Sequence, residues 1–192
     1  MAVDPIVRFQ RWYAQAHDGR ILQPDAMALA TADATGRPSV RMVLLKQADA
    51  DGFVFYTNAR SRKGRELRAN SRAALVFYWE HRGRQVRVEG TVTPVTPGEA
   101  DAYWATRPRE SQLAARASDQ SAPVVTRALL LGRWRALDRR YRGVPVPRPL
   151  HWIGYRVVPD AIEFWTHREH RLHDRERFIR TRRGWKMTRL QP

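Results

Sequence analysis

The chain has 192 residues, of which 43% are hydrophobic, with no cysteine and a formal net charge of +16 at pH 7. Its length and hydrophobic content suffice for one substantial core, so we expect a single domain over residues 1–192. Without cysteine, disulfides and thiolate metal sites are excluded, and no apolar run approaches the roughly 20 residues that cross a bilayer. We therefore expect a cytoplasmic protein with no membrane partner.

The positive charge by itself would suggest a nucleic-acid partner. Three of the 35 basic residues are lysines (Lys46, Lys63 and Lys186), and the others are arginines spread along the whole chain. Such a skew is explained more simply by genomic codon usage than by a binding surface. We expect no nucleic-acid partner and infer a positive field that attracts small phosphorylated ligands.

The N-terminal half is predicted to begin with a helix and to continue in strands. Asp4 suits the N-cap position and Pro5 the first helical position, and apolar residues at helical spacing extend the helix to about His17, with Gly19 closing it. Short apolar runs separated by turn residues then predict antiparallel strands, with one short helix over residues 61–69. The predicted strands cover residues 27–31, 39–46, 53–57, 73–80 and 85–94.

The C-terminal half is predicted to be helical first and then to return to strands. The predicted helices cover residues 96–106, 108–117 and 124–141, and the predicted strands cover residues 152–158, 161–166, 174–180 and 185–189. Three prolines in residues 143–149 predict an extended connection before these strands. The fold class is therefore mainly β with flanking helices (α+β), and the closely spaced strands suggest a barrel or sandwich.

The C-terminal segment is rich in basic residues. His167, His170 and His173 are spaced by three, which on a helix could indicate metal ligands. The flanking residues favour strands instead, in which alternate residues share a face. Arg171, His173 and Arg175 would then form a row suited to an anionic ligand, and we expect no metal. The alternative is a solvated charged strand.

Two further groups of residues suit phosphate. Tyr103, Arg107 and Ser111 would share one helix face if the helix continued past Pro108, and a phenol, a guanidinium and a hydroxyl suit a phosphate monoester. The other group combines residues 41–46, Tyr56 and Thr57 with the basic start of a predicted helix at residues 61–63. An ordinary exposed helix and an ordinary basic helix start are the alternatives. No glycine-rich nucleotide motif is present.

These segments together resemble the pyridoxine (pyridoxamine) 5′-phosphate oxidase family over nearly the whole chain. The resemblance is carried, in the family's order, by residues 41–46, 55–58, 61–63, 84–86, 107–109, 111–112, 120–121, 162–165 and 171–175. It implies an FMN-binding split β-barrel of antiparallel Greek-key type, which works as a homodimer and binds FMN at the subunit interface.

The resemblance also implies the ligand contacts. FMN would be bound by Arg41, Met42, Val43, Leu44, Leu45, Lys46, Tyr56, Thr57, Arg62, Lys63, Gln85, Gln120, Ser121, Trp165 and Arg175. The substrate would be bound by Lys46, Tyr103, Arg107 and Ser111 at its phosphate and by Arg171, Leu172 and His173 at its ring. Arg171 and His173 are the expected catalytic residues. Because a guanidinium does not deprotonate near neutral pH, Arg171 is assigned positioning and charge stabilisation, and His173 positioning or proton handling.

The implied reaction converts pyridoxine or pyridoxamine 5′-phosphate to pyridoxal 5′-phosphate, by hydride-like transfer from C4′ to flavin N5. Dioxygen then reoxidises the flavin and yields hydrogen peroxide. The chain departs from the family pattern at Arg116, at Ile153 and at residues 166–168. Two alternatives stay open: a related FMN split-barrel oxidase with another substrate, as in phenazine biosynthesis, and a basic binding protein without oxidase activity.

Overall fold

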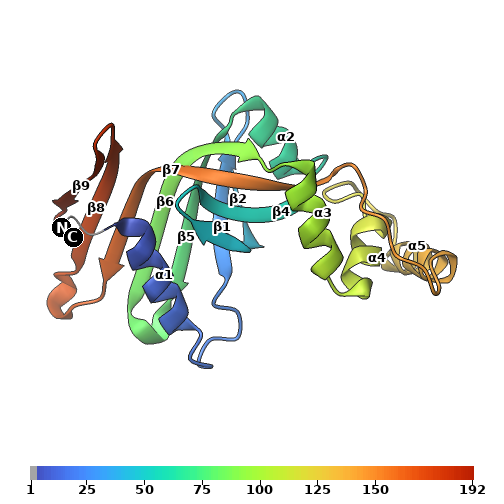
Figure 1. Ribbon diagram of the computed structural model, residues 1–192, viewed down its shortest axis with the longest axis horizontal. Coiled ribbons are helices and arrows are strands. Elements are labelled where there is room, and N and C mark those ends of the chain that lie inside the picture. Colours follow the sequence, from blue (N-terminus) through green and yellow to red (C-terminus); the bar gives the residue numbers. More distant parts are fainter. Residues whose placement is uncertain (1–3) are drawn as a thin grey trace.

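The computed structural model describes residues 4–192 as a curled antiparallel sheet of nine strands with five α-helices around it (Figure 1). The strands are β1 (Ala26–Ala32), β2 (Pro38–Leu44), β3 (Gln47–Asp49), β4 (Gly52–Asn58), β5 (Arg72–Trp79), β6 (Arg84–Pro94), β7 (Trp152–Thr166), β8 (Asp174–Thr181) and β9 (Gly184–Arg189). The helices are α1 (Pro5–Ala16), α2 (Arg62–Ala69), α3 (Pro97–Thr106), α4 (Arg109–Ala117) and α5 (Arg127–Arg140), with 3₁₀ turns η1 (Glu80–Arg82) and η2 (Glu169–Arg171). None of these helices is long and apolar enough to cross a membrane.

The sheet is organised around β7. Its strands follow the order β2-β1-β5-β6-β7-β4-β3, and β8 pairs with both β7 and β9. The first part of β7 pairs with β4 and the last part pairs with β8, while β6 lies along the other edge. Because β4 and β8 pair with different halves of one strand, the two ends of β7 lead into separate regions of the molecule.

The prediction of two strands over residues 152–166 is wrong, because β7 runs through without a break. Opposite it, β6 shifts register between Glu89 and Gly90, so that Asp160 is left without a partner residue as a β-bulge. A Cβ on Gly90 would lie 2.1 Å from the carbonyl oxygen of Val158. Pro159 and Asp160, which separate the two predicted strands, therefore bend β7 instead of ending it.

Other boundaries differ by small amounts. β2 ends at Leu44, β3 falls within a predicted turn, and α5 begins at Arg127 because Thr126 serves as its N-cap. The predicted N-cap Asp4 accepts a hydrogen bond from the backbone N–H of Ile6 at 2.7 Å. Thr96 and Glu99 form a capping box at the start of α3.

Two apolar clusters hold the fold together. The larger lies between α1 and the concave sheet, where Phe9 of α1 is fully buried against Phe53 and Phe77. The smaller is built from Trp104, Leu113, Val146 and Trp152 and joins α3, α4 and the proline-rich connection to the start of β7. This second cluster fixes the helices that carry one of the predicted phosphate sites.

Candidate functional site

A cavity of about 450 Å³ lies where β2, β4 and the start of β7 meet α2, α3 and α4. The predicted ligand residues that line it are Met42, Val43, Leu44, Lys46, Tyr56, Thr57, Lys63, Tyr103, Arg107, Ser111 and Gln120. Leu45 does not line it, since its side chain is only 3% exposed and lies in the core. Residues from both groups that were predicted to bind phosphate therefore line one cavity.

Tyr103, Arg107 and Ser111 all line this cavity, although they come from two helices and the break between them. Arg107 caps the C-terminus of α3 with extended backbone angles, and α4 begins after Pro108. The prediction of two separate helices over residues 96–106 and 108–117 is therefore confirmed, and the three residues do not lie on one continuous helix. Pro108 cannot donate a helical hydrogen bond and disfavours helical angles at Arg107, so the chain turns there before Ser111.

Arg107 is a desolvated cation. Its guanidinium carbon lies 4.7 Å from the ring centroid of Trp152 and 5.2 Å from that of Trp104. Burial lowers its pKa, and its Nη1 is buried without a hydrogen-bond partner among residues 4–192. A guanidinium held against two indoles, with a free donor beside a cavity, fits an anionic oxygen of a ligand.

A second buried cation lies at the start of α2. Lys63 is only 7% exposed, and its Nζ donates to Thr57 Oγ1 at 3.1 Å and to Gln120 Oε1 at 3.0 Å. No carboxylate within the described residues accepts a hydrogen bond from it or pairs with it. Burial, and then the charge of Arg41, lowers the pKa of Lys63 to about 8. A buried ammonium with neutral partners alone fits a phosphate group.

The neighbours of Lys63 complete the arrangement that is predicted to bind phosphate. Ser61 caps α2, and the backbone N–H of Arg62 donates to Ser121 Oγ at 3.1 Å. Gln120 and Ser121 come from the segment between α4 and α5, and Ser121 has a left-handed backbone with φ of 74°. The tertiary fold thus brings residues about 60 positions apart together at a helix N-terminus, where anions are favoured.

The other predicted FMN residues form a separate row. Gln85 of β6 lies opposite Trp165 of β7, which lies opposite Arg175 of β8. Arg175 donates to both carboxylate oxygens of Glu163 at 2.8 and 3.1 Å, and this pairing raises the pKa of Arg175. The ring of His173 lies 4.6 Å from that of Trp165.

The predicted strand row of Arg171, His173 and Arg175 is wrong. Residues 169–171 form the turn η2, in which His170 and Arg171 have φ of 55° and 61°, and β8 begins only at Asp174. Arg171 and Leu172 are exposed, while the Nδ1 of His173 accepts a hydrogen bond from the Arg168 backbone N–H at 3.1 Å. Consecutive residues with left-handed backbone angles cannot continue a strand. The turn, and not strand alternation, therefore determines the directions of these side chains.

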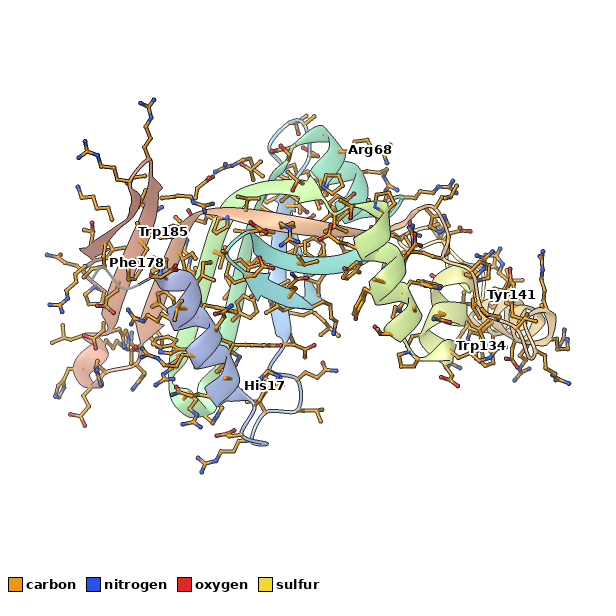
Figure 2. All side chains as sticks on the ribbon, in the orientation of Figure 1. His17, Arg68, Trp134, Tyr141, Phe178 and Trp185 are labelled. Carbon is orange, nitrogen blue, oxygen red and sulfur yellow. The ribbon has the colours of Figure 1, made fainter. Side chains whose placement is uncertain are left out.

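The cavity residues around Lys63 and Arg107 lie at one end of β7, and the row of Gln85, Trp165 and Arg175 lies at the other. Thr57 is opposite Ile153, whereas Gln85 is opposite Trp165. The 12 intervening steps correspond to about 40 Å of strand. Figure 1 shows α3 and α4 toward one end of the molecule and β8 and β9 at the other, and Figure 2 labels Trp134 at the first end and Phe178 and Trp185 at the second. One chain therefore does not bring both groups to one flavin.

Three residues at these sites were not identified from the sequence as site residues. Trp152 stacks on Arg107, Asp25 pairs with Lys46, and Glu66 is a buried carboxylate beneath the basic start of α2. Only Glu66 had a local signal, because it follows Arg62 by four residues and ion pairs form at that helical spacing. The other two contacts join residues that are distant in sequence.

Comparison with known proteins identifies relatives over the full chain. A family model described as pyridoxamine 5′-phosphate oxidase matches residues 13–137, and one described as the pyridoxine 5′-phosphate oxidase C-terminal dimerisation region matches residues 152–192. The pyridoxine/pyridoxamine 5′-phosphate oxidase of Novosphingobium aromaticivorans is 55% identical, covering 98% of this chain and 94% of the relative. The protein of the same name from Rubrobacter xylanophilus is 56% identical, covering 98% and 87%.

Two solved structures are similar. PhzG from Burkholderia lata, in complex with tetrahydrophenazine-1-carboxylic acid, is 38% identical with a TM-score of 0.93, covering 98% of this chain and 93% of that one. A pyridoxamine 5′-phosphate oxidase-related, FMN binding protein from Nostoc punctiforme is 16% identical with a TM-score of 0.81, covering both chains fully. The second likeness shows the fold alone, and it confirms the predicted split-barrel class.

Proposed function

The chain belongs to the pyridoxamine 5′-phosphate oxidase family, and from this we propose that it oxidises pyridoxine or pyridoxamine 5′-phosphate to pyridoxal 5′-phosphate. It is an FMN-dependent oxidoreductase. The observation that carries the substrate assignment is the cavity that Arg107 shares with Lys46, Tyr103 and Ser111, in which Arg107 has a buried donor with no partner in the part of the chain that the structure describes. A substrate without an anionic oxygen would leave that donor unpaired.

The residues present fit FMN. Lys63 and Arg62, with the hydroxyls of Thr57 and Ser121, supply cationic and neutral donors for its phosphate. Bound there, FMN supplies the redox chemistry by accepting a hydride equivalent from the substrate. The chain's own contribution is to neutralise the phosphate and to fix the position of the ring. The buried Lys63 ammonium is already desolvated, so it can neutralise the phosphate without first losing water.

The substrate phosphate is held by Arg107, Lys46, Tyr103 and Ser111. The indoles of Trp104 and Trp152 keep water from two sides of Arg107, so its attraction for the phosphate is less screened. Arg171 contributes positioning and charge stabilisation at the substrate ring.

His173 can hold a proton at one defined atom. Its Nδ1 accepts a hydrogen bond from the Arg168 backbone N–H, so the neutral ring carries its proton on Nε2. Nε2 is therefore the atom that donates to the substrate or exchanges a proton with it.

The enzyme is a homodimer, in keeping with the matched dimerisation region. We propose that each active site combines the Lys63 and Arg107 group of one subunit with the Trp165, Arg171 and Arg175 group of the other. The separation of these groups along β7 supports this arrangement. Residues 1–192 form one domain in this proposal, because β6 and β7, from the two matched regions, pair in one sheet.

Dioxygen is the proposed electron acceptor, with hydrogen peroxide as its product. The absence of nucleic-acid and membrane partners and the cytoplasmic location stay predictions. Cell fractionation and a salt-dependent DNA binding assay would test them.

The test is oxygen-dependent formation of pyridoxal 5′-phosphate by FMN-loaded protein, with peroxide measured in the same reaction. We expect conversion of pyridoxine 5′-phosphate, and a much higher KM for unphosphorylated pyridoxine as the matched control. Protein that binds FMN but converts neither phosphorylated substrate would favour an oxidase with another substrate, a candidate supported by the similarity to PhzG. Protein that binds no FMN would contradict both proposals.

A further inference from the structure

The start of α2 carries a buried acid among the predicted phosphate-binding cations. Glu66 is 5% exposed, and its carboxylate accepts four hydrogen bonds. Its Oε2 accepts from Thr31 Oγ1 at 2.5 Å, Ser39 Oγ at 2.6 Å and Arg41 Nη2 at 3.1 Å, and its Oε1 accepts from Arg62 Nε at 2.8 Å. These donors come from β1, β2 and α2, so Glu66 joins three elements.

The two hydroxyls act as intermediates between Glu66 and Arg41. Thr31 and Ser39 each donate to Glu66, and each accepts a hydrogen bond from the Arg41 guanidinium. The arginine is therefore held by the carboxylate directly and through both hydroxyls. This network leaves Arg41 one orientation at a site where an arginine side chain otherwise has several rotamers.

Arg62 is held differently. Its side chain is about half exposed, and its contact with Glu66 spans one helical turn. Without that ion pair, an exposed arginine side chain would be free to move into solvent, and ordering it would oppose ligand binding. Glu66 thus fixes the guanidinium of Arg62 next to the backbone N–H that reaches Ser121.

We propose that Glu66 is a positioning residue for binding of the FMN phosphate. Its carboxylate holds Arg41 and Arg62 in place and offsets one of the three positive charges of Arg41, Arg62 and Lys63. This inference rests on the proposed function, because it assumes that FMN occupies this site.

Charge balance supports the same role. Arg41 lowers the pKa of Lys63 and Glu66 raises it, while burial opposes the charged ammonium. The other groups that contact Lys63, Thr57 and Gln120, are neutral. Removing the carboxylate would leave three cations without an acid, so Lys63 would lose its proton more readily before FMN binds. Glu66 itself stays ionised, since hydrogen bonds lower its pKa to about 2 in spite of its burial.

The opposite expectation is that Glu66 repels the phosphate, so that its removal would strengthen binding. The geometry favours positioning, because each oxygen of Glu66 already accepts from an arginine and its negative charge is compensated within the network. Loss of the carboxylate would remove the orientation of two phosphate ligands at once.

The experiment compares the dissociation constants of FMN and riboflavin, measured by flavin fluorescence quenching at pH 7.5, in wild-type protein and in Glu66→Gln. Riboflavin lacks only the phosphate. We expect the FMN constant to rise about tenfold or more, while the riboflavin constant changes less than about twofold. Glu66→Asp, which keeps the charge with a shorter reach, should give an intermediate FMN constant. Glu89→Gln is the matched control, because Glu89 also pairs with two arginines, Arg87 and Arg177, on strands away from α2.

Equal weakening of FMN and riboflavin in Glu66→Gln would show a merely structural role and overturn the inference. An unchanged or tighter FMN constant would overturn it as well. If Glu66→Gln does not fold, Glu66→Asp decides the question by the same ratio. Absence of FMN binding by the wild-type protein would instead contradict the proposed function, which separates the two failures.

Discussion

Lys46 and Asp25 form an ion pair, with 3.0 Å between Nζ and Oδ2, at the cavity that contains Arg107. Asp25 is anchored there, because its backbone carbonyl accepts a hydrogen bond from Leu45 N–H at 2.8 Å. Both side chains are about one quarter exposed, so water partly screens the pair. A phosphate at Lys46 would share the ammonium with this carboxylate, whose negative charge would oppose it, so we expect Asp25 to weaken substrate binding.

Asp25→Asn should therefore lower the KM for pyridoxine 5′-phosphate. A partly exposed ion pair contributes about 0.5–1 kcal/mol, so we expect a decrease of about two- to fivefold with kcat unchanged. Steady-state kinetics measure both quantities. Asp160→Asn, at the β-bulge, is the control, because Asp160 pairs with Arg72 at an exposed site. A higher KM in Asp25→Asn would show instead that Asp25 orients Lys46 for the substrate.

Arg107→Ala should raise the KM for the phosphorylated substrate while FMN stays bound. Hydrogen bonds to charged groups contribute about 1.5–3 kcal/mol, which corresponds to an increase of roughly 10- to 150-fold. Arg109→Ala is the matched control, because Arg109 lies two residues away and pairs with Asp138. An unchanged KM in Arg107→Ala would refute the assignment of this phosphate site.

FMN affinity should decrease as the pH rises above about 8. Burial lowers the pKa of Lys63 to about 8, so below that pH the free protein carries the charge that a phosphate dianion needs. Above it, binding requires proton uptake, and the dissociation constant rises by up to about tenfold per pH unit. Fluorescence titrations between pH 6.5 and 9.5 measure this, with riboflavin as the ligand control. Lys63→Arg should remove the pH dependence of the FMN dissociation constant. If the constants of FMN and riboflavin changed with pH in the same way, the prediction would be contradicted.

Subunits with defects in different groups should complement one another. Lys63→Met and Arg171→Ala each disable one half of every site, but a mixed dimer has one site in which both halves are intact. Random reassociation of equal amounts should restore about a quarter of wild-type activity. Mixing Lys63→Met with Arg107→Ala is the control, because both changes affect the same half. Recovery in the control, or none in the first mixture, would exclude a site shared between subunits.

Local signals in the sequence were sufficient for most of the secondary structure. Asp4, Thr96 and Ser61 cap helices because their side chains reach backbone N–H groups only a few residues away. The wrong predictions lie where contacts with residues distant in sequence determine the secondary structure. Residues 159–160 separate the two predicted strands, yet pairing with β6 carries β7 through them as a bulge. Residues 169–171 look extended, yet they form a turn with left-handed angles.

The sequence by itself determined the antiparallel fold class, the family and the kinds of side chain that would meet phosphate, since caps, turns and motif order are local properties of the chain. Only the tertiary structure decided which of those side chains meet. It placed Gln120 on Lys63, stacked Trp152 on Arg107 and paired Arg41 with Glu66. Such contacts depend on the register and curvature of a sheet whose strands are far apart in sequence, and no spacing along the chain encodes them.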